Sequence, residues 1–600
     1  MDIVPTADTV VELLRQQAAR CGEKAAFSFS HYGDGRDGQE LTYRELDRRA
    51  RGIGAQLLQQ GAAGGRVLVL CRPGLEAIAG IFGCLYAGAI AVPVSERVVP
   101  QLASVIADVG ARFAVASPEM PDSIRSAVDT LTGRGGGKPV VWCGTDDGDA
   151  QAWVAPGVDA DSIALILYSA GSTRFPRGVV LTHENVMANV AATGHVWVGD
   201  RRQVAVSWLP THHAQGLIGA VLATIYAGAT TVLMAPSAFV QRPMRWLEAI
   251  SRWRATLTMA PDFAYRLCAR RSSVIERAGL DLSSLSRAVI AGVEPVRAVT
   301  MQSFADAFAP AGFCREVFAP VYGLAEATWL VSGGSDSQAP GVCHLDRAGL
   351  QSGWALDTDP KDRGAVSVVG CGRARQPVLI VDPDTRCECG PDEVGEIWVG
   401  GAGVAQSYWN APTQSDQIFE AFLADGGGGP FLRTGDRGFL RGGELFITGR
   451  CSDLVVVGGV HYYPNDLEFT VQDRHVALLT GRGAVFADDS EHLVVVQEVS
   501  SRIGEAELGK LMQMIQSTLI EHHGIQADSI LLVGEMRLPT TPVGEIQREV
   551  CRWQYLDGDL DTVAQWHAPV AVDPPGEPPK AKVVELTQSI ITRGRRASHS

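Results

Sequence analysis

The sequence LYSAGSTRFPRGVVL, residues 167–181, is the most informative stretch of this chain. The apolar run Ile163–Leu167 predicts a buried strand, and Thr182–Asn185 has polar residues typical of a helix start. The glycine, serine and threonine residues between them form a loop whose backbone N–H groups and hydroxyls can bind a polyanion, as nucleotide-phosphate loops do. No Gly-Lys-Ser/Thr follows, so it is not a Walker loop. Because an ordinary turn has the same composition about as often, the rest of the chain must decide.

The composition predicts a large globular protein. A length of 600 residues suggests several lobes, because domains typically contain about 100–200 residues. A hydrophobic share of 46% and a charged share of 20% are typical of a soluble chain. The formal net charge of -15 argues against binding to nucleic acid or to an anionic membrane surface. Lysine is rare, and the chain has only Lys24, Lys138, Lys361, Lys510, Lys580 and Lys582.

Several features favour a cytoplasmic location. The 12 cysteines are dispersed and lack zinc spacing, which favours reduced thiols. The N-terminal residues have no basic region followed by an apolar core, so we expect no secretory signal. The apolar stretch 77–94 is interrupted by glycines and ended by Pro93. We interpret it as a buried helix followed by a strand at Ala89–Val92, and we expect no membrane span.

Helix and strand patterns alternate through residues 1–449, which favours α/β layers. Strands are expected at Arg66–Leu70 and Thr230–Met234, and a helix is expected after Thr42 as its N-cap. A domain boundary is predicted near Arg450, and a second α/β pattern runs over residues 450–556. Residues 557–600 contain a proline-rich run at 573–579 and a basic run at 593–596, which predicts a flexible tail or, as the alternative, a docking element.

Tyr322, Gly323 and Glu326 form a Tyr-Gly-x-x-Glu motif. An aromatic ring followed by glycine can lie beside a nucleotide base while the backbone approaches closely. A glutamate a few residues later can hold Mg²⁺ against phosphate oxygens. The motif is weak by itself.

Two further motifs follow in the sequence. Thr434-Gly435-Asp436 places a carboxylate after a turn, where it can bind ribose hydroxyls, and Gly449-Arg450 offers a guanidinium to the ribose or phosphate. Alone, each is more often a turn aspartate or a surface arginine. The phosphate loop and the three motifs in this order span about 280 residues, and this combination indicates a nucleotide-binding enzyme.

The chain resembles the fatty acyl-AMP ligases, a branch of the adenylate-forming enzyme superfamily. The similar segments are GSTR at 171–174, AFVQRPMRWL at 238–247, PDFAY at 261–265, YGLAEAT at 322–328, VSGG at 331–334 and HYYP at 461–464. Residues 345–368 resemble the insertion that separates this branch from acyl-CoA ligases. The resemblance implies an adenylate-forming α/β fold, with a large N-terminal domain of three subdomains, a small mobile α+β C-terminal domain and the active site between them.

The resemblance also implies roles for individual residues, with ATP and Mg²⁺ as cofactors. The nucleotide ligands would be Ser172 and Thr173 at the phosphates, Gly292, Tyr322 and Gly323 at the adenine, Asp436 at the ribose and Arg450 at the ribose-phosphate edge. Glu326 would bind Mg²⁺. His213 matches a histidine between the nucleotide and the acyl tunnel, and its alternative is a packed core histidine. Met259 and Phe263 would line the tunnel.

The chain departs from the family pattern at several positions. Residues 213–217 are His-Ala-Gln-Gly-Leu where the family has His-Asp-Met-Gly-Leu, and Met259 replaces a small residue, which would shorten the tunnel. In the C-terminal domain, the hinge lysine is Ser452 and two usual arginines are Gly458 and Val460. Most consequentially, the lysine that enters the site during adenylation is replaced by Glu545.

The resemblance therefore implies an enzyme that activates a fatty or related carboxylic acid as an acyl-adenylate. The acyl group would pass to the phosphopantetheine thiol of an acyl carrier protein in lipid, polyketide or lipopeptide biosynthesis. His213, Arg450 and Glu545 are the expected catalytic positions, with adenylation impaired by Glu545. The alternative is a non-adenylating protein that binds nucleotide or acyl-AMP. An acyl-CoA ligase is disfavoured by the 345–368 insertion.

Overall fold

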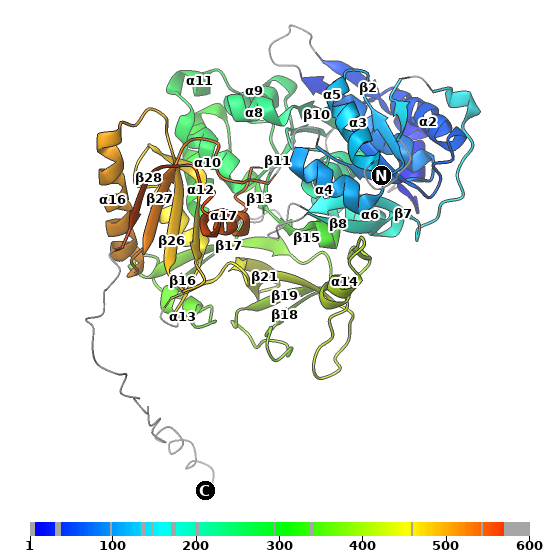
Figure 1. Ribbon diagram of the computed structural model, residues 1–600. Helices are drawn as coiled ribbons and strands as arrows, with labels where there is room; N and C mark the ends of the chain where they lie inside the picture. Colours follow the sequence, from blue (N-terminus) through cyan, green and yellow to red (C-terminus); the bar gives the residue numbers. More distant parts are fainter. Residues whose placement is uncertain are drawn as a thin grey trace.

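The computed structural model describes most of the chain. The described residues are 6–30, 38–95, 99–133, 140–146, 148–169, 176–197, 203–292, 295–334, 340–457, 460–541 and 544–568. Figure 1 shows three regions around a common centre: helices and strands of the first ~330 residues, a β-rich lower region, and the C-terminal helices and strands beside both. The region before Arg450 is thus the larger body, against which the C-terminal elements pack.

The first sheet contains the predicted strand at residue 163. Its strands are ordered β20 (Ser407–Tyr408), β8 (Arg177–Thr182), β7 (Ile163–Ser169), β4 (Ile90–Pro93), β3 (Arg66–Leu70), β5 (Phe113–Ala116) and β6 (Val141–Gly144). The predicted strands at 163–167 and 66–70 are confirmed, and α6 (His183–Trp197) begins where a helix start was expected. Strand β8, which comes after residues 170–175 in the sequence, was not predicted. It pairs antiparallel with β7.

The second sheet is parallel except at β2. Its strands are ordered β13 (Phe318–Pro320), β12 (Arg287–Ile290), β11 (Leu257–Ala260), β9 (Val204–Ser207), β10 (Thr230–Met234), β1 (Ala25–Ser30) and β2 (Gln39–Thr42). The strand expected at 230–234 is confirmed as β10. Leu165 of the first sheet and Val206 of the second belong to one buried hydrophobic cluster, so the two sheets share a core.

Helices α2 (Tyr43–Gln59) and α3 (Leu75–Tyr86) pack into this core. The backbone N–H of Glu45 donates to Thr42 Oγ1 at 3.1 Å, so the predicted N-cap is confirmed. Leu46, Ala50, Ile53 and Leu57 of α2 recur at helical spacing and are buried. The apolar stretch 77–94 forms α3 and then β4, as interpreted from the sequence. Within the described residues, no helix has the length and apolarity to cross a membrane.

An antiparallel sheet forms the lower region of Figure 1. Its strands are ordered β16 (Val342–Asp346), β17 (Ala365–Arg373), β22 (Glu444–Arg450), β21 (Leu432–Arg441), β19 (Gly395–Val399) and β18 (Val378–Val381). The 345–368 segment is part of this sheet, because it comprises the end of β16, helix α13 (Arg347–Gln351) and the start of β17.

The C-terminal region has its own core. Its elements are β23 (Val455–Val457), β24 (Val460–Tyr462), α15 (Pro464–Gln472), β25 (Leu478–Ala487), β26 (Leu493–Val499), α16 (Glu505–His523), β27 (Ser529–Val533), α17 (Arg548–Leu556) and β28 (Thr562–His567). Two buried clusters draw their residues from 455–566 alone. Strand β28 pairs with β27 and completes the sheet, so the predicted end of this subdomain at Leu556 is too early and the start of the tail at residue 557 is corrected.

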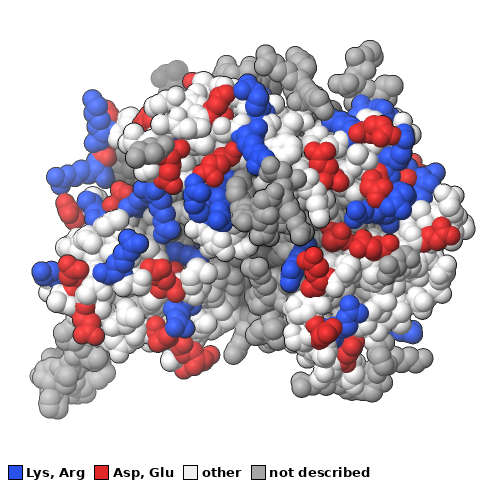
Figure 2. Space-filling view, turned by 90° about the horizontal axis from the view of Figure 1, so that it is seen from above, with Lys and Arg blue, Asp and Glu red and all other residues white. Residues whose placement is uncertain are grey.

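The described chain has further helices, turns and short strands outside these sheets. They are α1 (Val10–Cys21), α4 (Val99–Val109), α5 (Asp122–Gly133), η1 (Ala150–Ala152), η2 (Gln215–Leu222), α7 (Ala223–Tyr226), α8 (Pro236–Gln241), α9 (Met244–Trp253), α10 (Asp262–Arg271), α11 (Val274–Ala278), α12 (Ala298–Phe308), η3 (Ala309–Ala311), η4 (Arg315–Val317), β14 (Tyr322–Gly323), η5 (Ala325–Ala327), β15 (Leu330–Ser332) and α14 (Pro412–Phe419). Figure 2 shows acidic and basic side chains intermingled over one face, without a continuous basic patch there.

Candidate active site

A cavity of about 870 Å³ lies where the N-terminal sheets, the antiparallel sheet and the C-terminal subdomain meet. Its wall includes the predicted site residues His213, Gly292, Tyr322, Gly323, Glu326, Asp436, Arg450 and Glu545. Ser172 and Thr173 lie outside the described residues, while Tyr168 of β7 and Arg177 of β8 line the cavity. The structure thus brings together residues that are more than 300 positions apart in the sequence.

The parallel sheet explains why three of these residues meet. His213 follows β9, Gly292 follows β12, and Tyr322 follows β13. These strands belong to one parallel sheet, so their carboxyl ends lie at the same edge. Ligands of open α/β sheets bind outside this edge.

Asp436 connects the antiparallel sheet to the Tyr-Gly-x-x-Glu motif. Its Oδ2 accepts a hydrogen bond from the Tyr322 hydroxyl at 2.7 Å, and its Oδ1 accepts one from Arg450 Nε at 2.8 Å. Asp436 is only 4% exposed, and this burial raises the pKa of its carboxyl while the neighbouring Arg450 charge opposes the rise. A carboxylate held in this way can accept hydrogen bonds from the hydroxyls of a sugar.

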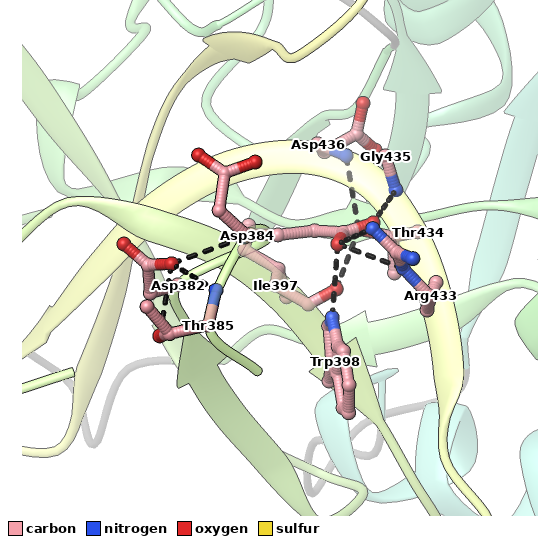
Figure 3. A network of polar contacts seen from close by, with 10 residues as sticks. Asp382, Asp384, Thr385, Ile397, Trp398, Arg433, Thr434, Gly435 and Asp436 are labelled. Carbon is pink, nitrogen blue, oxygen red and sulfur yellow. Dashed lines mark hydrogen bonds and ion pairs between the residues drawn. The ribbon is translucent and has the colours of Figure 1, made fainter. Parts of the chain in front are cut away.

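A second buried carboxylate fixes the turn before Asp436. Glu396 Oε1 accepts from the Gly435 backbone N–H at 3.1 Å, and its Oε2 accepts from Arg433 Nη2 at 2.8 Å. The Thr434 hydroxyl donates to the Ile397 carbonyl at 2.7 Å. Gly435 has φ +72°, a backbone angle that residues with a side chain rarely adopt. Figure 3 shows Arg433, Thr434 and Gly435 held against β19 with Asp436 projecting beyond them.

Glu326 is oriented by two residues that the sequence reasoning missed. The Tyr408 hydroxyl donates to Glu326 Oε1 at 2.9 Å. The Arg177 guanidinium carbon lies 5.2 Å from the centroid of the Tyr408 ring. Pairing of β20 with β8 brings Tyr408 to Arg177. The signal available in the sequence was the aromatic pair after Ser407, but nothing in its spacing connects it to Glu326.

The arrangement around Glu326 suits Mg²⁺ bound together with a nucleotide. Mg²⁺ commonly takes one or two carboxylates and completes its shell with phosphate oxygens and water. Within the described part of the chain, no group of three or more histidine, cysteine, aspartate or glutamate side chains could hold a metal by itself. The single carboxylate of Glu326, which lines the cavity, fits a metal that arrives with ATP.

His213 stands at the entrance to η2. Its Nδ1 accepts the Gln215 backbone N–H at 3.4 Å, and burial lowers the pKa of the ring to about 4. The ring is therefore neutral near pH 7. Gln215 in turn donates from Nε2 to the Ala291 carbonyl at 3.1 Å, which joins this segment to the residue before Gly292.

Glu545 lies inside the cavity and is 7% exposed. A methyl group placed on Gly292 would approach Glu545 Oε1 to 2.5 Å, so the carboxyl end packs directly on the Gly292 backbone. The position at which the family has lysine is thus within the site. Ser452, at the usual hinge lysine, also lines the cavity. Val460 is exposed in β24, and Gly458 lies outside the described residues.

Arginines on α10 and before α12 hold the subdomain in the orientation that inserts Glu545. Arg297 forms an ion pair with Asp466 of α15. The guanidinium carbons of Arg266 and Arg297 lie 4.9 and 5.2 Å from the centroid of the Phe469 ring. Arg266 also donates to Gln472 Oε1 at 3.0 Å. This part of the domain contact pairs arginines on one side with α15 on the other.

Met259 and Phe263 are not among the residues that line this cavity in the described chain. Met259 is buried in β11, and a methyl group on Gly219 would lie 2.9 Å from its Cε and 3.2 Å from the Trp329 ring. Trp329 lines the cavity and Met259 does not, so Met259 lies behind the cavity wall. Phe263 faces the C-terminal subdomain, because methyl groups on Gly481 and Gly544 would lie 3.1 and 3.0 Å from it.

Comparisons with known proteins identify the family of this chain. The AMP-binding enzyme family matches residues 14–409, and the Disco-interacting protein 2-like AMP domain matches residues 452–565. The medium-chain-fatty-acid–[acyl-carrier-protein] ligase JamA of Moorena producens is 36% identical, over 95% of this chain and 98% of its own. The long-chain-fatty-acid–AMP ligase FadD32 of Mycolicibacterium smegmatis is 33% identical, over 93% and 95%.

Solved structures give the same result. The fatty acid AMP ligase of Legionella pneumophila superposes with a TM-score of 0.72 at 33% identity, covering 94% of this chain and 98% of that one. A structure from studies of the fatty acyl-adenylate ligases of E. coli and L. pneumophila gives a TM-score of 0.82 at 27% identity, over 93% and 99%. The predicted adenylate-forming fold is confirmed, and the chain belongs to the AMP-binding enzyme family and, within it, to the fatty acyl-AMP ligase branch.

Proposed function

We propose that this protein activates a fatty or related carboxylic acid with ATP and Mg²⁺ and passes the acyl group to the phosphopantetheine thiol of an acyl carrier protein. The observation that supports the proposal best is the hydrogen-bonded unit Tyr322–Asp436–Arg450, which lines the same cavity as Glu326. The carrier protein as acceptor is suggested by JamA, which is named as an acyl-carrier-protein ligase.

In the proposed adenylation, Tyr322, Gly323 and Gly292 surround the adenine, and Asp436 accepts hydrogen bonds from the ribose. A carboxylate oxygen of the acid attacks the α-phosphorus, a new O–P bond forms, and the bond to the β-phosphate oxygen breaks as pyrophosphate leaves. Mg²⁺ held by Glu326 would neutralise phosphate charge. Arg450 would lie at the ribose-phosphate edge, and neutral His213 would lie between the nucleotide and the acyl group, where it can donate or accept a hydrogen bond.

Glu545 makes this step slow in the proposal. The reacting carboxylate and triphosphate are both anionic, so the step depends on positive charge and hydrogen-bond donors. Losing one such donor costs on the order of 10²–10³ in rate. An ionised glutamate would add repulsion of roughly 4 kcal/mol for unit charges 4 Å apart at an effective dielectric of 20.

Two other functions remain candidates. A non-adenylating protein that binds nucleotide or acyl-AMP is favoured by one specific observation, the placement of the Glu545 carboxyl against Gly292. An acyl-CoA ligase is disfavoured by the 345–368 segment, which forms an ordered part of the antiparallel sheet.

The test is pyrophosphate release across a panel of acids, with AMP calorimetry in parallel. A separate assay supplies synthetic acyl-AMP and a phosphopantetheinylated carrier protein. We expect nucleotide binding, slow pyrophosphate release that accelerates in Glu545→Lys, and acyl transfer to the carrier. Binding without release in either protein would identify the non-adenylating alternative, and formation of a CoA thioester would identify the acyl-CoA ligase.

A further inference from the structure

Hydrogen bonds between Thr541 and residues 544–545 fix the backbone at Glu545. The Thr541 N–H donates to the Glu545 carbonyl at 2.7 Å, and the Glu545 N–H donates to Thr541 Oγ1 at 3.2 Å. The Gly544 N–H donates to the Thr541 carbonyl at 2.9 Å. These bonds fix the backbone from which the side chain projects, so its direction is set by the fold.

Two glycines make room for this placement. Gly544 has φ +94°, and a methyl group on it would lie 3.0 Å from Phe263 Cζ. Gly292 lets the carboxyl end approach its backbone, because a methyl group there would lie 2.5 Å from Glu545 Oε1. A side chain at position 544 would press on Phe263, and one at position 292 would displace the carboxyl. The absence of side chains at these two glycines therefore leaves the space that Glu545 occupies.

ATP binding changes what a carboxyl group in this position can do. A nearby anion favours the protonated form of a carboxyl group, as does removal of water. The protonated form has an O–H donor, whereas the ionised form only accepts hydrogen bonds. Hydrogen bonds from O–H groups to anionic oxygens are short and strong. The protonated carboxyl can thus supply the donor that an ionised glutamate lacks.

We propose that Glu545 takes part in adenylation as its protonated acid, donating a hydrogen bond to a phosphate or carboxylate oxygen at the reaction centre. This inference rests on the proposed adenylating function. The proton stays on Glu545 throughout, and the bonds made and broken are the O–P bonds already described. Glu545 is then a catalytic residue whose competence depends on pH.

Other charged groups share the cavity wall and must be accounted for. They are Arg177, His213, Glu326, Arg386, Glu396, Asp416, Glu420, Arg433, Asp436, Arg450, Asp453, Arg548 and Glu549. Asp436 is paired with Arg450, and Glu396 with Arg433. Arg548 is paired with Asp453 and Glu468. His213, with a pKa of about 4, stays neutral above pH 5.5.

Glu549 is the other carboxyl group on the C-terminal side whose titration must be separated from that of Glu545, since burial raises the pKa of the Glu549 carboxyl. It lies four residues after Glu545 in the sequence, in the first turn of α17. Any pH dependence of adenylation must therefore be assigned by variants of both residues.

The first experiment measures pyrophosphate release at saturating ATP and acid between pH 5.5 and 8.5. We expect the wild-type rate to be steady at the acid end of this range, where Glu545 stays protonated in the ATP complex, and to fall as pH rises further, approaching tenfold per pH unit. Glu545→Gln keeps a neutral donor, so its rate should be nearly independent of pH and exceed wild type at pH 8.5. Glu545→Ala has no donor and should be flat and about 10²-fold slower than Glu545→Gln. Glu549→Gln and the exposed Glu507→Gln should retain the wild-type slope.

A second experiment is independent of turnover. Calorimetry with the α,β-methylene analogue of ATP at pH 7, in buffers of different ionisation enthalpy, measures proton uptake on binding. We expect uptake of up to about one proton by the wild type and clearly less by Glu545→Gln. Equal uptake in both proteins would overturn the proposal.

The outcomes separate this inference from the proposed function. A wild-type rate without pH dependence, or a Glu545→Gln variant that keeps the slope or is as slow as Glu545→Ala, overturns the acid role while adenylation stands. If neither the wild type nor Glu545→Lys releases pyrophosphate at any pH, the proposed function fails and this inference fails with it.

Discussion

Tyr322 and Asp436 lie 114 positions apart in the sequence, yet the Tyr322 hydroxyl donates to Asp436 Oδ2 at 2.7 Å. Tyr322 follows the parallel sheet, and Asp436 projects from the antiparallel sheet. Their contact therefore joins the Tyr-Gly-x-x-Glu motif to the predicted ribose ligand. Burial raises the pKa of the Tyr322 hydroxyl, so it remains a donor at neutral pH.

This contact predicts the effect of Asp436→Ala on nucleotide affinity. We expect ATP and acyl-AMP analogues to bind the wild type at micromolar Kd. Asp436→Ala should weaken the binding of these analogues at least tenfold, because the ribose loses its acceptor and Arg450 loses its partner. Titration calorimetry measures this, with the exposed Asp425→Ala as control. Unchanged affinity in Asp436→Ala would remove the assignment of the ribose site.

Arg177 should bind the part of ATP that leaves as pyrophosphate. The cavity arginines Arg433, Arg450 and Arg548 are each paired with a carboxylate, whereas Arg177 lies over the ring of Tyr408, whose hydroxyl orients Glu326. Arg177→Ala should weaken ATP several-fold and leave AMP affinity nearly unchanged, with partial recovery in Arg177→Lys. Competition binding of ATP and AMP measures the ratio. Equal weakening of both nucleotides would contradict this placement.

Arg297 should matter for adenylation more than for acyl transfer. It pairs with Asp466 and lies over Phe469, contacts that hold the orientation in which Glu545 enters the cavity. Arg297→Ala should lower pyrophosphate release several-fold. Transfer from synthetic acyl-AMP to the carrier should change little if that step uses another orientation of the subdomain. Arg254→Ala, which removes an exposed pair with Asp281, is the control. A parallel loss in both half-reactions would argue against this assignment.

The sequence predicted the residues that meet at the cavity because their motifs are local. A strand followed by a glycine-rich loop, or a turn followed by an aspartate, is visible within ten residues. The sequence did not predict β28. The residues of this strand, Thr562–His567, alternate between partly buried and exposed at the edge of the sheet. Such an edge strand buries too little apolar surface to stand out beside a proline-rich segment.

Contacts between distant segments were also missed for a physical reason. The Tyr408–Glu326 hydrogen bond depends on the pairing of β20 with β8, and register between remote strands leaves no local pattern in the sequence. The same applies to Glu545. The substitution was evident from its motif, but its position against Gly292 depends on how the two domains pack.

Buried His183 should make the protein less stable in acid. It is 1% exposed, its Nδ1 accepts the Val10 N–H at 3.3 Å, and burial lowers the pKa of the ring to about 4. The folded state therefore binds fewer protons than the unfolded state between pH 6.5 and 4, so the free energy of unfolding falls as pH decreases through this window. The loss is at most about 3 kcal/mol.

Denaturant unfolding at pH 7 and pH 4.5 measures this effect. His183→Asn should be less sensitive to acid than the wild type, while the exposed His461→Asn should show the full wild-type loss. An identical acid sensitivity in His183→Asn would show that the loss arises from other groups.

Met259 should limit the length of the acyl group from behind the cavity wall. Its Cε and the ring of the cavity-lining Trp329 both border the space that a side chain on Gly219 would take, 2.9 and 3.2 Å from a methyl group there. Met259→Gly removes this side chain, and we expect it to shift the preference of pyrophosphate release towards longer acids. The variant should also lose about 2–5 kcal/mol of stability, as buried truncations do. Met259→Leu conserves volume and should keep the wild-type profile. If Met259→Gly folds and its chain-length profile matches that of Met259→Leu, then the acyl group does not extend towards β11, and Trp329 itself closes the cavity on that side.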